Sequence, residues 1–231
     1  MKAPLEQASP EGLASLFKVR SRDNILAMLH AFKLPANEIA ALFVAISFAA
    51  GLNVYATVGT LGLLSHAHLV ELPPGLHAIA DWWVVGASAA LFAIEFVVDK
   101  IPVIDLIWNA LHTFVRVPVA ALLAYGATSQ LSPGKQLLAT LIGGAIALAA
   151  HGSKTALRAV VTPSPEPVSN TVLSLGEDGL AIGLTWFATA HPYSAAALVV
   201  LFLSIIAVLF RKVVRALGGM FRGEKFPAYH T

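Results

Sequence analysis

The 231-residue sequence contains no cysteine. This absence excludes disulfide bonds, thiolate metal sites and cysteine nucleophiles. Charged residues are also scarce, at 12% of the chain, whereas soluble domains carry about 25%. Apolar residues take their place, because 57% of the chain is hydrophobic and the mean hydropathy is +0.75. The composition is that of a membrane protein, and no polar interval is long enough for a separate soluble domain.

The sequence also lacks the common signatures of intramembrane and hydrolytic enzymes. It contains neither a GxSxG nucleophile elbow nor an HExxH zinc motif. We therefore expect no enzymatic activity and no cofactor. His66, His68 and His77 could bind a metal ion on the outer face, but HAH spacing alone is unspecific, and ordinary surface histidines are the preferred explanation, so we expect no metal site.

Six apolar segments are long enough to cross a membrane as helices, which takes about 20 residues. They are 38–65, 77–98, 104–126, 136–161, 171–190 and 193–210. Short Pro- and Gly-containing stretches, LPPG, SPG, PSPEP and HP, mark most of the turns between them. These features predict an all-α polytopic membrane bundle of six transmembrane helices. The third segment is amphipathic in its first half, so an interfacial helix followed by a re-entrant segment is the alternative there.

The chain divides into a cytoplasmic N-terminal tail (1–36), a transmembrane domain (37–210) and a basic C-terminal tail (211–231). Apolar residues at helical spacing within 24–32 predict an interfacial amphipathic helix in the first tail, with a partly ordered tail as the alternative. Pro4, Glu6 and Pro10 interrupt any early apolar run, so we expect no cleavable signal peptide.

The distribution of basic residues gives an independent test of topology. With six crossings and both termini in the cytoplasm, most of the 15 Lys and Arg residues lie on the cytoplasmic side, as the positive-inside rule requires. The basic tails would then attract anionic lipids, at about 1 kcal/mol per basic residue near the surface. Because membrane orientation already explains this distribution, we expect no nucleic-acid partner.

Polar residues inside the predicted spans recur at helical spacing, so each set lines one helix face. The sets are Asn53, Thr57 and Thr60; Glu95 and Asp99; Asp105, Asn109, His112 and Arg116; His151, Lys154, Thr155 and Arg158; and Asn170, Ser174 and Glu177, with Asp178 beside it. A charged side chain at the bilayer centre costs about 2.5–3.5 kcal/mol and therefore turns toward protein or water. The five faces together predict a shared polar interior, whereas the nearly bare sixth span is expected to face lipid.

We expect this interior to form a pathway for a solute or ion. Its predicted lining is Asn53, Glu95, Asp99, Lys100, His112, Arg116, His151, Lys154, Arg158, Asn170, Glu177 and Asp178. Arg116 lies deepest, and Glu95 is its most plausible counter-charge if the second and third spans pack as an antiparallel hairpin. For the charged residues toward the span ends, snorkelling to the membrane surface is the structural alternative.

A weak internal similarity suggests two halves. AAGLNVYAT (49–57) resembles AAHGSKTAL (149–157), and each is followed downstream by a pair of acidic residues. Three spans per half would make two inverted three-helix repeats, an arrangement common among secondary transporters. A chance alignment of small residues explains the similarity equally well.

Several separated motifs, in order, resemble the signature stretches of a bacterial membrane family known only as domain of unknown function number four-one-two-six. The motifs are GLNVYATVG (51–59), EFVVDKIP (95–102), HTFVR (112–116), HGSK (151–154), SPEPVSN (164–170) and SLGED (174–178). The resemblance covers roughly 38–210. It implies a small integral membrane protein and supplies no activity, so no catalytic role carries over. We expect the protein to lie in the bacterial inner membrane, with both termini in the cytoplasm.

Two functions remain open from the sequence. The first is a small transporter or channel-like protein that moves an ion, a small solute or a lipid headgroup through the polar interior lined by Glu95, His112 and Arg116. The alternative is a non-catalytic accessory or scaffold subunit, either as a homo-oligomer or within a larger membrane complex. Access of water discriminates between them, because a scaffold would keep Glu95 and Arg116 dry and paired.

Overall fold

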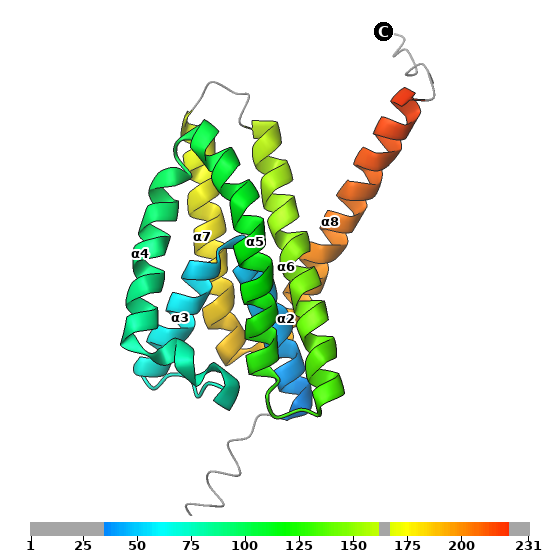
Figure 1. Cartoon of the computed structure of the whole chain (residues 1–231). Helices are drawn as coiled ribbons and strands as arrows, with labels where there is room; N and C mark the ends of the chain where they lie inside the picture. Colours follow the sequence, from blue (N-terminus) through cyan, green and yellow to red (C-terminus); the bar gives the residue numbers. More distant parts are fainter. Residues whose placement is uncertain (1–34, 162–166, 222–231) are drawn as a thin grey trace, which may run out of the picture. The chain divides into compact units, whose positions relative to one another are not determined.

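A computed structural model describes residues 35–161 and 167–221. Contacts divide the chain into Met1–Pro35 and Ala36–Thr231, and the fold below is that of the second unit. The helix predicted within 24–32 and most of the PSPEP turn lie outside the described residues. The described part is all-helical, which confirms the predicted fold class (Figure 1). Its helices are α2 (Ala36–Leu52), α3 (Val54–His66), the 3-10 helix η1 (Pro74–Ala80), α4 (Trp82–Val98), α5 (Pro102–Ala127), α6 (Pro133–Val161), α7 (Pro167–Ala190) and α8 (Pro192–Phe221).

Prolines begin the last four helices. Pro102, Pro133, Pro167 and Pro192 are the first residues of α5 to α8. At this position the missing N–H would have no helical partner anyway, and the fixed φ angle suits a helix start. Pro118 lies inside α5, yet α5 is unbroken over its whole length of 26 residues. The third predicted span is therefore one continuous helix, and the alternative of an interfacial helix plus a re-entrant segment is wrong.

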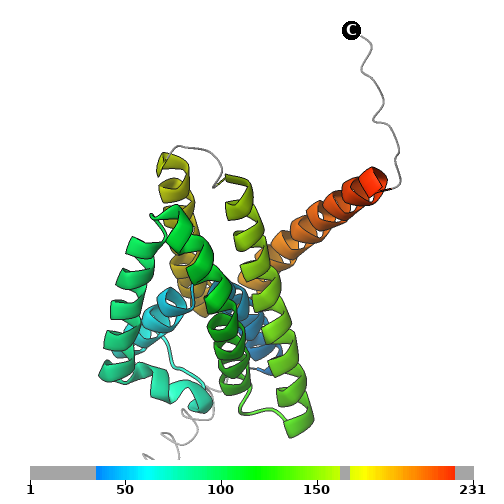
Figure 2. The same ribbon diagram turned by 45° about the horizontal axis from the view of Figure 1, so that its top comes forward.

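The first predicted span is not one helix. It breaks at Asn53, whose backbone is extended (φ −149°, ψ 105°), and whose side-chain oxygen accepts a hydrogen bond from the Ala56 N–H. The prediction of a single helix over 38–65 is wrong because Asn53 competes for a backbone N–H that a continuous helix would use. Figures 1 and 2 both show α2 running into the bundle and α3 leading back out from the break.

Contacts along the two helices agree with this returning path. Gly51, near the end of α2, lies against Ala147 and Ala150 of α6. At the C-terminal end of α3, the His66 ring stacks on the Trp82 ring at the start of α4, with the ring centroids 3.9 Å apart. The α2–α3 pair is thus a helical hairpin with its apex at Asn53.

The number of membrane crossings is only partly established. Three helical segments in the described ranges are long and apolar enough to cross a membrane, Ile107–Ala127, Pro133–Arg158 and Pro192–Arg215. The number of candidate spans rises to four if η1 and α4, which meet at a bend of 65°, together form one span. Apolar helices of this length are compatible with a membrane protein. Six crossings and the inverted repeats are not confirmed.

The orientation of the tails is likewise not established. Asn37 at the start of α2 donates a hydrogen bond to the Tyr193 hydroxyl at the start of α8, over 2.5 Å. Since α8 is 30 residues long, Asn37 and Phe221 lie toward opposite ends of this helix. This placement does not support the expectation that both termini share one side of the membrane.

Small residues bring the helices into close contact around α2, which packs against α5, α6, α7 and α8. Buried alanines occupy the facing surfaces, namely Ala45, Ala49, Ala50, Ala120, Ala124, Ala127, Ala147, Ala150, Ala181, Ala188 and Ala195. Small side chains at helix interfaces are the usual route to close packing in membranes, where apolar burial gives little drive. In contrast, α8 exposes Val200, Leu201, Ile205, Val208, Leu209 and Phe210, as expected for a lipid-facing helix.

We expect Gly143→Ala to destabilise the fold by about 1–3 kcal/mol, the usual cost of overpacking a core. A Cβ atom at Gly143 would lie 2.5 Å from the Ala124 Cβ and 2.8 Å from the Ser47 Oγ. Gly144→Ala is the matched control, because a Cβ atom at Gly144 would lie 3.5 Å from its nearest neighbour, the Ala121 Cβ. Thermal unfolding in detergent measures both. Equal melting temperatures for the two variants would contradict the packing described here.

Candidate functional site

Charged side chains from α4, α5, α6 and α7 meet inside the bundle. We call them the ion-pair cluster, which comprises Glu95, Asp99, Asp105, Arg116, Lys154, Arg158 and Glu177. All are buried except Glu177, whose side chain is 10% exposed. Ionised groups in such surroundings require partners, because their desolvation costs several kcal/mol each, roughly.

Arg116 pairs with Glu95, and both side chains are fully buried. The second Arg116 amino group donates to Asn109 Oδ1 over 3.3 Å and to His151 Nδ1 over 3.0 Å. Asn109 precedes Arg116 by two helical turns, so the helix itself positions these two side chains on one face. The predicted Glu95–Arg116 pair is confirmed as a contact.

Lys154 lies between three carboxylates. Its ammonium nitrogen is 3.4 Å from Glu95 Oε1, 3.7 Å from Asp99 Oδ2 and 3.2 Å from Glu177 Oε2. It also donates to the Leu52 carbonyl over 3.3 Å. Lys154 therefore connects α4 and α7 to the last residue of α2.

Arg158, one turn further along α6, also contacts three carboxylates, two of which it shares with Lys154. Its two amino groups lie 2.5 Å from Asp105 Oδ1, 2.8 Å from Asp99 Oδ2 and 2.6 Å from Glu177 Oε2. Burial alone would raise the pKa of Asp99, which lies in the turn after α4. The Lys154 and Arg158 charges outweigh burial and lower that pKa below its ordinary value, which keeps Asp99 ionised.

The helix break adjoins the cluster. The Asn53 amide nitrogen donates to Asp178 Oδ1 over 2.8 Å, while the Asn53 side-chain oxygen caps α3. A helix carries partial negative charge at its C-terminus and partial positive charge at its N-terminus. The end of α2 accordingly faces the Lys154 ammonium, and the start of α3 faces the Asp178 carboxyl through Asn53.

Two histidines flank the cluster, and their protons are assigned from their hydrogen-bond partners. His112 Nδ1 lies 2.9 Å from the Trp108 carbonyl and donates to it, and Nε2 lies 3.0 Å from the Tyr55 hydroxyl. His151 Nε2 lies 3.0 Å from the Asn109 carbonyl and donates to it, leaving Nδ1 to accept from Arg116.

The structure brings together most of the residues predicted from sequence. Glu95, Asp99, Arg116, Lys154, Arg158 and Glu177 belong to the cluster, and His151 contacts it through Arg116. Asn53 and Asp178 bond to each other at the helix break, and His112 bonds to Tyr55 and to the Trp108 carbonyl. Lys100 does not join the cluster, because it donates to the Phe96 carbonyl and lies over the Phe96 ring, 3.0 Å from its centroid. The side chain of Asn170 lies outside the described residues.

Two participants were missed in the predicted lining. Asp105 forms an ion pair with Arg158 and accepts a hydrogen bond from the Asn109 side chain over 2.5 Å. Its helical spacing to Asn109 could have identified it as a lining residue. Tyr55 bonds His112, but nothing in its spacing signals that contact.

Several carboxylate oxygens of the cluster and of the neighbouring Asp178 have no hydrogen-bond partner among the described residues. They are Glu95 Oε2, Asp99 Oδ1, Glu177 Oε1 and Asp178 Oδ2. The same part of the chain contains no group of three or more His, Asp or Glu side chains arranged to hold a metal ion. Of the outer histidines, His77 contacts the Leu72 carbonyl over 3.0 Å and His66 stacks on Trp82.

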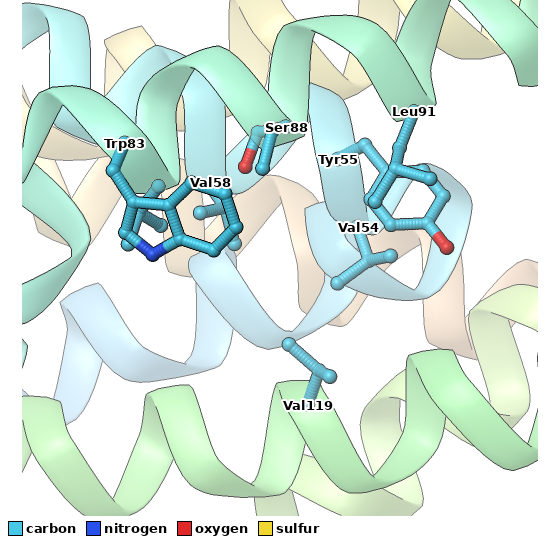
Figure 3. A pocket seen from close by; sticks show the side chains of 9 residues that line it. Val54, Tyr55, Val58, Trp83, Ser88, Leu91 and Val119 are labelled. Carbon is cyan, nitrogen blue, oxygen red and sulfur yellow. The ribbon is translucent and has the colours of Figure 1, made fainter.

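A small apolar pocket of about 250 Å³ lies beside the cluster, between α3, α4 and α5 (Figure 3). Its lining is Val54, Tyr55, Val58, Trp83, Val84, Ala87, Ser88, Leu91 and Val119. Tyr55 is the one lining residue that also bonds His112. None of these nine lining residues is charged.

Comparison with known proteins identifies a family but no function. A family model described as "Domain of unknown function (DUF4126)" matches residues 40–212. No curated protein and no solved structure matches the chain. The matched range contains every residue of the ion-pair cluster as well as Asn53 and Asp178.

Proposed function

Because the chain belongs to the DUF4126 family, whose function is unknown, we propose a function from its geometry. The proposed function is that of a membrane transport protein, which moves an ion, a small solute or a lipid headgroup through the polar interior lined by Glu95, His112 and Arg116. The observation that carries this proposal is the helix break at Asn53, which adjoins the ion-pair cluster.

Broken helices have a specific use in membranes. Irregular backbone at membrane depth is tolerated where it is buried in protein or lines a cavity. In many secondary transporters, the ends of such half-helices bind substrate and coupling ions. Here the two half-helix ends already face an ammonium group and a carboxyl group, Lys154 and Asp178.

The number of buried charges also supports a functional interior. Replacing buried ion pairs with well-packed apolar residues is often neutral or stabilising, so such pairs are weak evidence of a stabilising role. Ionisable residues within membrane segments instead commonly mark ion or substrate pathways. Seven cluster residues contributed by four helices are more than packing alone requires.

Transport is tested on purified full-length protein reconstituted in liposomes, by screening for flux driven by gradients of protons, anions and cations. We expect Glu95→Gln and Arg116→Gln each to lower the flux at least about tenfold, because each leaves its buried partner unbalanced. Glu71→Gln and Lys135→Gln are the matched controls, since both side chains are exposed. Circular dichroism confirms that each variant retains its helices.

Loss of flux in both cluster variants, with normal flux in both controls, supports transport through the cluster. Absence of flux with every solute contradicts it. The natural absence of cysteine allows a second readout, in which Thr57→Cys is treated with a water-soluble thiol reagent. Labelling of Thr57→Cys, and not of the equally buried Thr185→Cys, indicates water access to the break.

One observation favours a second candidate, a non-catalytic accessory subunit of a homo-oligomer or larger membrane complex. Glu95 and Arg116 are fully buried and paired, which is the condition expected of a dry structural interior. A stable membrane partner recovered with the full chain, together with no flux and no labelling of Thr57→Cys, would select this function over transport.

We further propose a location in the bacterial inner membrane. The end of α8, with its exposed Arg211, Lys212 and Arg215, would face the cytoplasm, as the positive-inside rule favours. Anionic lipids are the proposed partners of these basic residues.

A further inference from the structure

We propose that Asp178 is a proton-binding site at the helix break, so that the ion coupled to transport is H⁺. This inference deepens the proposed function and rests on it for the coupling role alone. The presence of a proton on Asp178 is an independent claim about the folded protein.

The first argument is the balance of charge. Four carboxyl groups are more than nine-tenths buried, Glu95, Asp99, Asp105 and Asp178, and they face three basic groups, Arg116, Lys154 and Arg158. The partly exposed Glu177 adds a fifth carboxyl. If all were ionised, the interior would hold an excess of one or two negative charges. Buried carboxylates without a counter-charge take up a proton instead of remaining ionised.

The second argument is that the buried carboxyl group without a basic partner among the described residues is that of Asp178. Glu95, Asp99, Asp105 and Glu177 each form at least one ion pair within 4.0 Å. Asp178 forms none with the described residues, although its side chain is only 5% exposed. Its hydrogen-bond partner is Asn53, at Oδ1, and its Oδ2 atom has no partner in the described chain.

The orientation of Asn53 decides which ligand this carboxyl group can take. The Asn53 side-chain oxygen accepts from the Ala56 N–H, so its amide nitrogen must be the atom that faces Asp178. A donor N–H at Oδ1 suits either form of the carboxyl group. A metal ion would need several oxygen ligands, and the described residues contain no group of three or more His, Asp or Glu side chains arranged to hold one. A proton needs only one oxygen, and the unpartnered Oδ2 provides it.

The groups that face Asp178 oppose each other. Glu95 and Asp99, on α4 and the turn after it, disfavour a further negative charge, whereas Lys154 on α6 favours one. Glu177 is the neighbouring acid on α7. The start of α3 also favours a negative charge, through the helix dipole. Lys154, however, is already bound to Glu95, Glu177 and the Leu52 carbonyl. Lys154 is therefore not a dedicated counter-charge for Asp178, which favours the protonated form of this carboxyl group.

The step itself is a simple proton equilibrium. Ionised Asp178 takes up one H⁺ on Oδ2 and becomes a neutral carboxylic acid, and release restores the carboxylate without any other bond changing. Because Asp178 and Lys154 hold the two half-helix ends, gain or loss of this proton changes the electrostatic balance at the break.

Infrared difference spectroscopy on the full-length protein in liposomes tests the site. We expect a carbonyl stretch from a protonated carboxylic acid at neutral pH, shifted in D₂O, in the wild type. Asp178→Asn should lose this band, and Asp81→Asn, at an exposed acid, should keep it. Titration to high pH should abolish the wild-type band with release of about one proton per chain.

A second measurement protects against misfolding of the variant. Asparagine has nearly the shape of a protonated aspartic acid and no charge, so Asp178→Asn should melt within a few degrees of wild type at neutral pH. An absent band in the wild type, or a band that survives in Asp178→Asn, overturns the proposal. So does stabilisation of the wild type, but not of Asp178→Asn, by Na⁺, because the occupant would then be a metal cation.

The two proposals fail separately. A band that depends on Asp178 in a protein without flux would leave the proton site in place and remove the transport function. Flux without the band would retain transport and remove Asp178 as its proton site.

Discussion

Replacing Arg116 with glutamine is expected to lower the free energy of unfolding by about 3–5 kcal/mol, because removal of one partner leaves a buried charge uncompensated. Arg116 contacts Glu95, Asn109 and His151, and its side chain is fully buried. Among the described residues, the Arg116→Gln variant leaves Glu95 with Lys154, at 3.4 Å, as its one basic partner. Unfolding by heat or by sodium dodecyl sulfate in mixed micelles measures the loss.

The double variant Glu95→Gln/Arg116→Gln distinguishes the pair from the individual side chains. It contains two neutral amides and no unpaired charge at this position, so it should be more stable than Arg116→Gln alone. Contacting residues commonly show interaction energies of about 0.5–3 kcal/mol in such cycles. Additive losses from the two single changes would contradict the described pair. Lys135→Gln, on an exposed side chain, should remain within about 0.5 kcal/mol of wild type.

The face of α5 shows what sequence spacing can predict. Asp105, Asn109 and Arg116 are separated by four and seven residues, so any α-helix places them on one side. The charged residues of the neighbouring helices were likewise expected to turn inward, because lipid cannot solvate them. Local periodicity and the cost of desolvation together predicted the polar interior and the Glu95–Arg116 contact, although not the individual partners of Lys154.

The break at Asn53 shows what spacing cannot predict. The residues on both sides of Asn53 are apolar or small, so hydropathy alone predicts one continuous span. The ends of the two helices are satisfied by Lys154 and Asp178, which lie more than a hundred residues further along the chain. A break stabilised by such distant partners appears only once the helices are packed together.

The prediction for the start of the second span was wrong for a different reason. The apolar stretch 77–98 predicted one spanning helix, but its first residues belong to η1, which meets α4 at an angle of 65°. Asp81 lies at the junction in an extended conformation, with no side-chain capping bond. Apolar composition sets how much of a segment prefers lipid, whereas the direction of the chain depends on such single backbone positions.

Arg158 is expected to be the most sensitive position of the cluster, because it is the only basic residue described within hydrogen-bonding distance of three carboxylates, at 2.5–2.8 Å. Arg158→Gln leaves Asp105 without any basic partner in the described chain and Asp99 with Lys154 at 3.7 Å. We expect a loss of at least about 3–5 kcal/mol, and therefore little folded protein in membrane preparations.

Arg158→Lys separates charge from geometry. One guanidinium nitrogen of Arg158 donates a hydrogen bond to Asp105, and the other donates to Asp99 and Glu177. A lysine ammonium is a compact point charge and lacks this planar arrangement of donors. The expected order of melting temperature is therefore wild type, then Arg158→Lys, then Arg158→Gln, with Arg211→Lys on the exposed face of α8 as the unaffected control. Equal stability of Arg158→Lys and wild type would show that charge alone is sufficient. A graded loss would show that α4, α5 and α7 are held by a directional contact from α6, so that a change of charge at the break could be transmitted to all four helices.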